Sequence, residues 1–249
     1  MISYKDSYNT QESVKKWIDK LSIEVNDSYP IDNIESLIPD FKRNVAVDLG
    51  ANIGLFSIKA AKSFKHVHAF EPVPFLSSIA NNKLNAHGFE NVIINRLAAA
   101  DKTGQITKIY KSKSGHPGNN SLFETDDMNL SEYDNCLTIS LEDIFKLIDH
   151  DYIDYMKMDI EGSEYSFMNG KDLSNIGVIA MEIHNHPSDS NAIKDLQKHI
   201  SQYMHIWRLF QHSEHNMICV NKSYKLAFEN TLKYYDPSAD EYLDLEKIY

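Results

Sequence analysis

The chain has 249 residues, a formal net charge of −11 and two cysteines, Cys136 and Cys219, that lie far apart. The acidic charge argues against a nucleic-acid partner, and the cysteine count excludes a disulfide framework or a thiolate zinc site and favours a reducing, cytoplasmic location. Hydrophobic residues make up 42% of the sequence, which excludes a disordered chain and allows one sizeable core.

From Asn44 onward, short apolar runs alternate with longer amphipathic stretches. The short runs predict three strands, at Val45–Leu49, His66–Phe70 and Asn91–Asn95. Helical spacing of apolar residues predicts two helices between these strands, at Ile53–Ser63 and Pro74–Ala86. Pro74 suits the first turn of the second helix, and Gly88 suits its end.

The next stretch, Ala98–Leu137, reads as irregular, with one expected strand at Gln105–Tyr110 and a polar loop at Ser112–Ser121. Regular alternation resumes at Ser140, which forms an N-cap signature with Asp143 three positions later. The remaining predicted elements are, in order, the helix Leu141–Ile148, the strand Tyr152–Met158, the helix Gly162–Met168, the strand Ile176–Ile183, the helix Ala192–Ile200 and a hairpin of His205–Phe210 and Met217–Val220.

Strands that alternate with helices require a mostly parallel sheet covered on both faces. We therefore predict an α/β fold with a doubly wound, Rossmann-like, seven-stranded and mostly parallel sheet, closed by an antiparallel hairpin. We expect a single domain with a catalytic core at 44–221, because no linker divides the chain. The helical extension 1–43, with an amphipathic helix at Gln11–Leu21, and the acidic, Tyr-rich extension 222–249 are expected to pack on this core rather than to act as lids. The polar start and short apolar runs predict no secretory signal and no membrane span.

The strongest motif is Asp48–Gly54, at a turn from a strand into a helix. Gly50 lets the chain turn tightly and lets a ligand approach the backbone. A second acid, Glu71, ends the next strand, where doubly wound folds place a carboxylate that binds ribose hydroxyls. Asn52 stands where dinucleotide-binding motifs have their second glycine, and its side chain would hinder a pyrophosphate. The motif therefore favours an adenosine ligand without phosphates.

With these residues the sequence resembles the FkbM-like family of class I S-adenosylmethionine-dependent methyltransferases over Val45–Val220. The resemblance rests on four segments: Asp48–Gly54, Phe70–Pro72, Lys157–Glu164 and Met181–His184. It implies S-adenosylmethionine as cofactor and O-methylation of a sugar hydroxyl, in a nucleotide-activated sugar or a glycan. The cofactor-binding residues that it implies are Asp48, Gly50, Ala51, Asn52 and Gly54 for the methionine part, Glu71 and Pro72 near the ribose, and Ala98 near the adenine.

A second group of polar residues lies at the ends of two later strands. Asp159 and Glu161 follow one strand, and Glu182, His184 and His186 follow the next. Because the carboxyl ends of parallel strands open into the ligand crevice, we expect these side chains to meet beside the cofactor.

Three roles for this group stay open. His184 or Asp159 could act as a general base, with Glu182 as a further catalytic candidate. Alternatively, Asp159, Glu182 and His184 could bind magnesium, manganese or ferrous iron, which would lower the pKa of the acceptor hydroxyl. In the third alternative they form a hydrogen-bonded network without chemistry. For the whole chain, the competing hypotheses are a nicotinamide-dependent oxidoreductase and a non-catalytic adenosine-binding module. The oligomeric state and the identity of the acceptor are not determined by these patterns.

Overall fold

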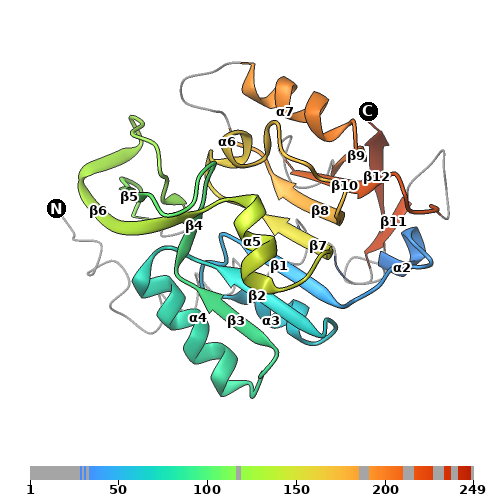
Figure 1. Ribbon diagram of the computed structural model, residues 1–249, viewed down its shortest axis with the longest axis horizontal. Helices are drawn as coiled ribbons and strands as arrows, with labels where there is room; N and C mark the ends of the chain where they lie inside the picture. Colours follow the sequence, from blue (N-terminus) through green and yellow to red (C-terminus); the bar gives the residue numbers. More distant parts are fainter. Residues whose placement is uncertain are drawn as a thin grey trace.

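The computed structural model describes residues 29, 31, 34–115, 119–184, 191–209, 216–226, 233–236 and 241–247. Its main sheet has nine strands in the order β11-β12-β9-β10-β8-β7-β1-β2-β3 (Figure 1). These strands are, in chain order, β1 (Val45–Leu49), β2 (His66–Phe70), β3 (Val92–Asn95), β7 (Ile153–Met158), β8 (Ile176–Glu182), β9 (Met204–Leu209), β10 (Asn216–Asn221), β11 (Lys233–Asp236) and β12 (Glu241–Lys247).

The pairing confirms the predicted seven-stranded, mostly parallel sheet. Strand β1 pairs in parallel with β2 and β7, and the parallel pairs β2–β3 and β7–β8 continue the sheet on either side. Strand β10 pairs antiparallel with both β8 and β9, which is the predicted closing hairpin. The carboxyl ends of the parallel strands therefore lie at one edge, where doubly wound folds bind ligands.

Two strands of the main sheet were not predicted. Strands β12 and β11 continue the sheet beyond β9, each by antiparallel pairing. They lie within the residues 222–249 that the sequence indicated only as an acidic, Tyr-rich extension. Charged and tyrosine residues dominate both segments, so they lack the apolar run that identifies a buried strand.

Helices cover both faces of the sheet, as predicted. On one face, buried side chains of α5 (Leu141–Ile148), α6 (Glu164–Met168) and α7 (Ala192–Ile200) pack with Val45, Val47 and other sheet residues. On the other, α2 (Ile34–Leu37) and α3 (Leu55–Ala61) pack with the alternate residues of the same strands, such as Ala46. Neighbouring side chains of a strand point to opposite faces, so fully buried strands serve both layers.

The interpretation of Ala98–Leu137 as irregular is wrong, although the one strand expected there, at Gln105–Tyr110, is confirmed at Ile106–Ser112. This stretch and its borders form a second sheet of three strands in the order β4-β6-β5, beside the main sheet at the left of Figure 1. The strands are β4 (Leu97–Ala99), β5 (Ile106–Ser112) and β6 (Met128–Ile139). Most of the first eight residues of β6 are exposed or half-buried, so polar residues interrupt its pattern and the strand was missed.

The element boundaries agree closely with the prediction elsewhere. Helix α4 (Pro74–Ala86) matches fully, and the Ser140 side chain accepts a hydrogen bond from the Asp143 backbone as the N-cap of α5. Helix α3 is shorter than predicted because Gly54, with φ of 79°, lies in the left-handed region before its first turn. The predicted helix Gln11–Leu21 lies outside the described residues.

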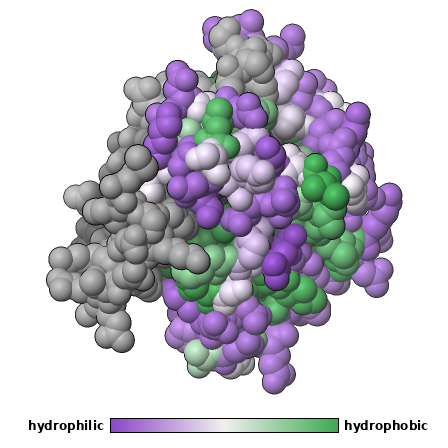
Figure 2. All heavy atoms as spheres, turned by 90° about the vertical axis from the view of Figure 1, so that its left-hand side faces the viewer, coloured by the Kyte–Doolittle hydropathy of each residue, from purple (hydrophilic) through white to green (hydrophobic). Residues whose placement is uncertain are grey.

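The face shown in Figure 2 is mainly hydrophilic where its residues are described. On the face shown in Figure 2, hydrophobic residues form separate areas rather than one continuous surface. The exposed large hydrophobic side chains come from five elements, α4, α5, β3, β5 and β6. Among the described residues, no helix is both long and apolar enough to cross a membrane.

Candidate functional site

A cavity of about 600 Å³ lies at the carboxyl ends of the central strands. Its walls include the turn after β1, the residues after β2, the strand β4 and the loop between β5 and β6. Lys157, Asp159, Glu182 and His184 line it from β7, β8 and the residues that follow these strands. The second sheet, which the sequence did not predict, thus supplies part of the cavity wall.

At Gly50, the turn after β1 contacts the backbone at the ends of both neighbouring strands, β2 and β7. Its N–H and that of Ala51 each donate to the Phe70 carbonyl over 3.0 Å. Gly50 has φ of +73°, and a Cβ at this position would lie 1.8 Å from the Asp159 carbonyl oxygen. Glycine is therefore required here by the tight turn that the sequence predicted, which has a left-handed backbone, and in addition by the backbone at the end of β7.

Glu71 lies where the turn after β1 meets the end of β2. Its Oε2 accepts from Asn52 N–H over 2.7 Å, and its Oε1 accepts from Val73 N–H over 2.9 Å. Burial raises the pKa of Glu71 to about 7, although both backbone donors oppose this shift. Each carboxylate oxygen can accept two hydrogen bonds, so Glu71 keeps capacity for hydroxyl groups in the cavity.

Asn52 shares this corner with Glu71. Its φ of 52° is uncommon for a residue other than glycine. Its buried Oδ1 has no hydrogen-bond partner among the described residues. Ala51, Pro72 and Ala98 also line the cavity, so six of the eight residues proposed for the cofactor come together.

The other two, Asp48 and Gly54, lie behind the cavity wall. Asp48 is fully buried, and its Oδ2 accepts from the Ser57 hydroxyl over 2.6 Å. Burial raises the pKa of Asp48, and the nearby Lys157 ammonium opposes that shift. A Cβ at Gly54 would lie 2.9 Å from the Ala80 Cβ, so Gly54 permits close packing of α3 against α4.

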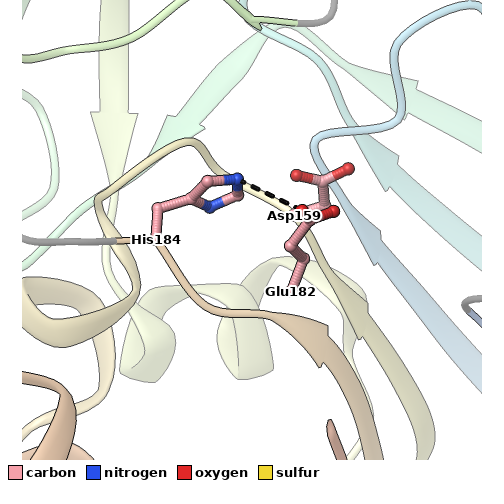
Figure 3. A group of neighbouring side chains, drawn as sticks. All are labelled: Asp159, Glu182 and His184. Atoms are coloured by element: carbon pink, nitrogen blue, oxygen red, sulfur yellow. Dashed lines mark ion pairs between the residues drawn. The ribbon is translucent and has the colours of Figure 1, made fainter. Parts of the chain in front are cut away.

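The second predicted group comes together as well. Each of three residues, Asp159, Glu182 and His184, offers one potential ligand atom, and these three atoms lie within 4.8 Å of one another. Figure 3 shows the His184 ring directed toward the two carboxylates, which come from the ends of the adjacent strands β7 and β8. The buried Asp159 Oδ1 has no hydrogen-bond partner among the described residues. A histidine nitrogen and two carboxylates can hold a divalent cation.

Two further carboxylates surround His184. Its Nδ1 donates to Glu164 Oε1 over 2.9 Å, and its Nε2 lies 3.5 Å from Glu161 Oε2 and 3.8 Å from Glu182 Oε1. Burial lowers the pKa of His184, but the Glu164 hydrogen bond and the neighbouring charges outweigh it and raise the pKa to about 10. Burial and the Asp159 charge raise the pKa of Glu161. The hydrogen bond to Glu164 thus orients the His184 ring so that Nε2 faces Glu161 and Glu182.

Sequence reasoning assigned no role to Lys157 or Glu164, although both lie in the quoted segment Lys157–Glu164. Glu164 is buried five residues after Asp159, at the start of α6, and its position next to His184 depends on the packing of α6 against β8. The loop between β5 and β6 also reaches the cluster, because the Ser121 hydroxyl donates to the Glu161 carbonyl over 2.7 Å. His186 lies outside the described residues.

Known proteins that are similar to this chain include methyltransferases. A model of the methyltransferase FkbM domain matches residues 48–218, more than half of the chain. A search of curated protein sequences finds no match. Among solved structures, a methyltransferase FkbM from Methylobacillus flagellatus KT is 18% identical with a TM-score of 0.46, and the similarity covers 71% of this chain and 43% of that one. The chain thus spans less than half of that protein.

Two other solved structures are similar over larger parts of their own length. An rRNA methylase from Streptococcus thermophilus is 12% identical with a TM-score of 0.40, covering 72% of this chain and 86% of that one. A SAM-dependent methyltransferase from Leishmania major is 12% identical with a TM-score of 0.44, covering 88% of this chain and 79% of that one.

Proposed function

The chain belongs to the FkbM methyltransferase family, and on that premise we propose that it is an S-adenosylmethionine-dependent O-methyltransferase that acts on a sugar hydroxyl. The observation that carries this proposal is one cavity lined by two chemically different groups of residues. The first group is Asn52 and Glu71, and the second is Asp159, Glu182 and His184. The first group suits an adenosine, and the second suits an acceptor hydroxyl.

The first group, Asn52 and Glu71, and the residues next to it fit the cofactor. Glu71 is a buried carboxylate with spare acceptor capacity, and carboxylates at this place in doubly wound folds bind ribose hydroxyls. The turn Gly50–Asn52 would hold the methionine part, and Pro72 and Ala98 would contact the nucleoside. When bound, S-adenosylmethionine supplies an electrophilic methyl group on a sulfonium. The walls of the cavity then hold the acceptor oxygen in line with that group, which is the main task in a displacement.

At the second group we propose a divalent cation held by Asp159, Glu182 and His184. Their ligand atoms lie close enough together, and Asp159 Oδ1 is buried without a partner among the described residues. Such a cation lowers the pKa of an acceptor hydroxyl and orients it. A general-base role for His184 is disfavoured, because a cation bound at Nε2 would take the lone pair that a base would use, while Nδ1 is hydrogen-bonded to Glu164. On methyl transfer, the acceptor oxygen would form a bond to the methyl carbon while the bond from that carbon to the sulfonium sulfur breaks. The electron pair of the broken bond would stay on sulfur in S-adenosylhomocysteine, and the hydroxyl proton would leave to solvent.

The proposed acceptor is a small molecule or a glycan rather than a nucleic acid. Four carboxylates line the cavity, those of Glu71, Asp159, Glu161 and Glu182, and they would repel a phosphate backbone. Hydroxyl groups, in contrast, can donate to carboxylates and bind a divalent cation. The two cysteines, Cys136 and Cys219, are free and buried, which fits the reducing cytoplasm in which we place the enzyme.

Thermal unfolding with S-adenosylhomocysteine and with NAD tests the cofactor. We expect stabilisation by S-adenosylhomocysteine alone, of about 2.7 kcal/mol at a hundredfold excess over the dissociation constant. Treatment with EDTA is expected to lower the unfolding temperature of the metal-loaded protein, and manganese should restore it. Stabilisation by NAD alone would contradict the methyltransferase proposal, and a melting temperature indifferent to EDTA and manganese would contradict the cation.

The affinity for S-adenosylhomocysteine is expected to rise with pH through the titration of Glu71. The folded-state pKa of about 7 lies above the ordinary 4.5, so the apo protein binds an extra proton between these values and loses stability as the pH rises through this window. Ribose hydroxyls favour the ionised carboxylate, so affinity should increase up to about tenfold per pH unit below the pKa. Isothermal titration calorimetry at a series of pH values measures this slope. Glu71→Gln should flatten it, and a slope that survives this substitution belongs to another group.

A further inference from the structure

Lys157 is a buried cation in the cavity wall to which no role has been assigned. It lies in β7, two residues before Asp159, and is only 4% exposed. Its Nζ donates to the Gly50 carbonyl over 2.7 Å and to the Leu49 carbonyl over 3.3 Å. The ammonium group therefore lies directly beneath the turn that would hold the methionine part of the cofactor.

The surroundings of Lys157 leave it able to bind an anion. An ammonium carries three protons, and two of them point to backbone carbonyls. The Tyr29 ring, which also lines the cavity, lies 5.0 Å from Nζ and is an uncharged neighbour. The carboxylates of Asp48 and Asp159 balance its charge at longer distances, 3.6 Å and 3.7 Å from Nζ. Asp48 is fully buried and does not line the cavity, so it neutralises Lys157 from behind without occupying the side that faces the ligand.

The other cation of the cavity is committed elsewhere. His184 lies between Glu161, Glu164 and Glu182, all within 3.8 Å of its ring nitrogens. The remaining charged side chains that line the described cavity are carboxylates. An anionic group entering the cavity would therefore find in Lys157 its one favourable charged partner among the described residues.

On the basis of the proposed function, we infer that Lys157 binds the α-carboxylate of the cofactor's methionine part. That part is a zwitterion. Its carboxylate matches the Lys157 ammonium, and its ammonium matches the Gly50 carbonyl oxygen, an acceptor that lies 2.7 Å from Nζ. A cation flanked by acceptors is thus complementary to an amino acid, whereas a nucleoside alone would gain nothing from a buried lysine. The segment Lys157–Glu164 explains why Lys157 lies here. Lys157 is two residues before Asp159, and residues two apart on a strand share a face.

Calorimetry with two ligands tests this inference. S-adenosylhomocysteine and its decarboxylated analogue differ only in the carboxylate, and both are titrated into the full chain and into Lys157→Met. We expect the wild type to prefer S-adenosylhomocysteine by about 10- to 100-fold, the range that a charge-assisted hydrogen bond provides. Lys157→Met should lose this preference and bind the analogue within about threefold of wild type. Lys146→Met, which removes an exposed lysine paired with Asp143, is the matched control and should keep the preference.

The outcomes separate this inference from the proposed function. If the wild type binds neither ligand, the cofactor assignment fails and this inference fails with it. If the wild type binds both ligands equally, or if Lys157→Met weakens both by the same factor, Lys157 only fastens the turn to β7 and the inference is overturned. Lys157→Gln keeps a donor for the Gly50 carbonyl and replaces the methionine variant if that variant does not fold. Equal affinities of the wild type for S-adenosylhomocysteine and the decarboxylated analogue would overturn the inference even without either variant.

Discussion

Gly50→Ala is expected to destabilise the protein by about 4 kcal/mol or more, a loss large enough to prevent folding in a marginally stable domain. The new Cβ would lie 1.8 Å from the Asp159 carbonyl oxygen and 2.9 Å from its carbon. Both atoms belong to the backbone, so no side-chain rotation relieves the contact. The turn after β1 and the end of β7 would have to separate, which would break the hydrogen bond from Asp159 N–H to the Leu49 carbonyl. Urea denaturation of both proteins measures the change in the free energy of unfolding.

Gly104→Ala is the matched control for this substitution. Gly104 has φ of +78°, close to the +73° of Gly50, but a Cβ there meets nothing within 4 Å. The control therefore carries only the backbone cost of a left-handed alanine, about 1–2 kcal/mol. The difference between the two variants reports the contact with Asp159. Equal losses in both would show that the turn and β7 are not packed as described.

Asp159→Asn is expected to reduce methyl transfer by about 10²–10⁴-fold while leaving the affinity for S-adenosylhomocysteine nearly unchanged. Asparagine keeps the size of the side chain but removes the negative charge that would hold a divalent cation. Glu71 and the Asp159 side chain both line the cavity but come from different strand ends, and the backbone contact with Gly50 does not depend on the Asp159 side chain. Release of S-adenosylhomocysteine measures turnover, and calorimetry measures the binding of cofactor product and of manganese.

Two further variants sharpen this experiment. Asp134→Asn removes a carboxylate of β6 that pairs with Lys111 outside the cavity, and it should leave turnover at the wild-type rate. His184→Ala should show the same defect as Asp159→Asn. If Asp159 is a ligand, a higher manganese concentration should partly restore turnover, whereas a lost general base would not respond. Wild-type rates in both Asp159→Asn and His184→Ala would refute the proposed role of the cluster.

Much of the fold could be predicted because its central elements are buried and clearly bounded. The strand β1 is a fully buried run, apolar except for Asp48, that stops at Gly50, and α4 begins at Pro74 and ends before Gly88. Strands β6, β11 and β12 carry many polar residues, and an apolar run is the signal on which strand prediction depends. These strands are stabilised instead by pairing with other strands: β6 pairs with β4 and β5, and β12 pairs with β9 and β11.

By itself, the sequence determined the family segments, the order of the central elements and the candidates Glu71, Asp159, Glu182 and His184, because local patterns and the rule for strand ends suffice for these. Only the tertiary structure decided which neighbours each group has. It buries Asp48 behind the wall, sets Glu164 against His184 and brings Lys157 under the Gly50 turn. Burial, charge pairing and the reach of a side chain depend on residues up to a hundred positions apart, such as Gly50 and Lys157 at a separation of 107. These long-range contacts turn a list of polar residues into a site with a cation, an acid cluster and a cavity between them.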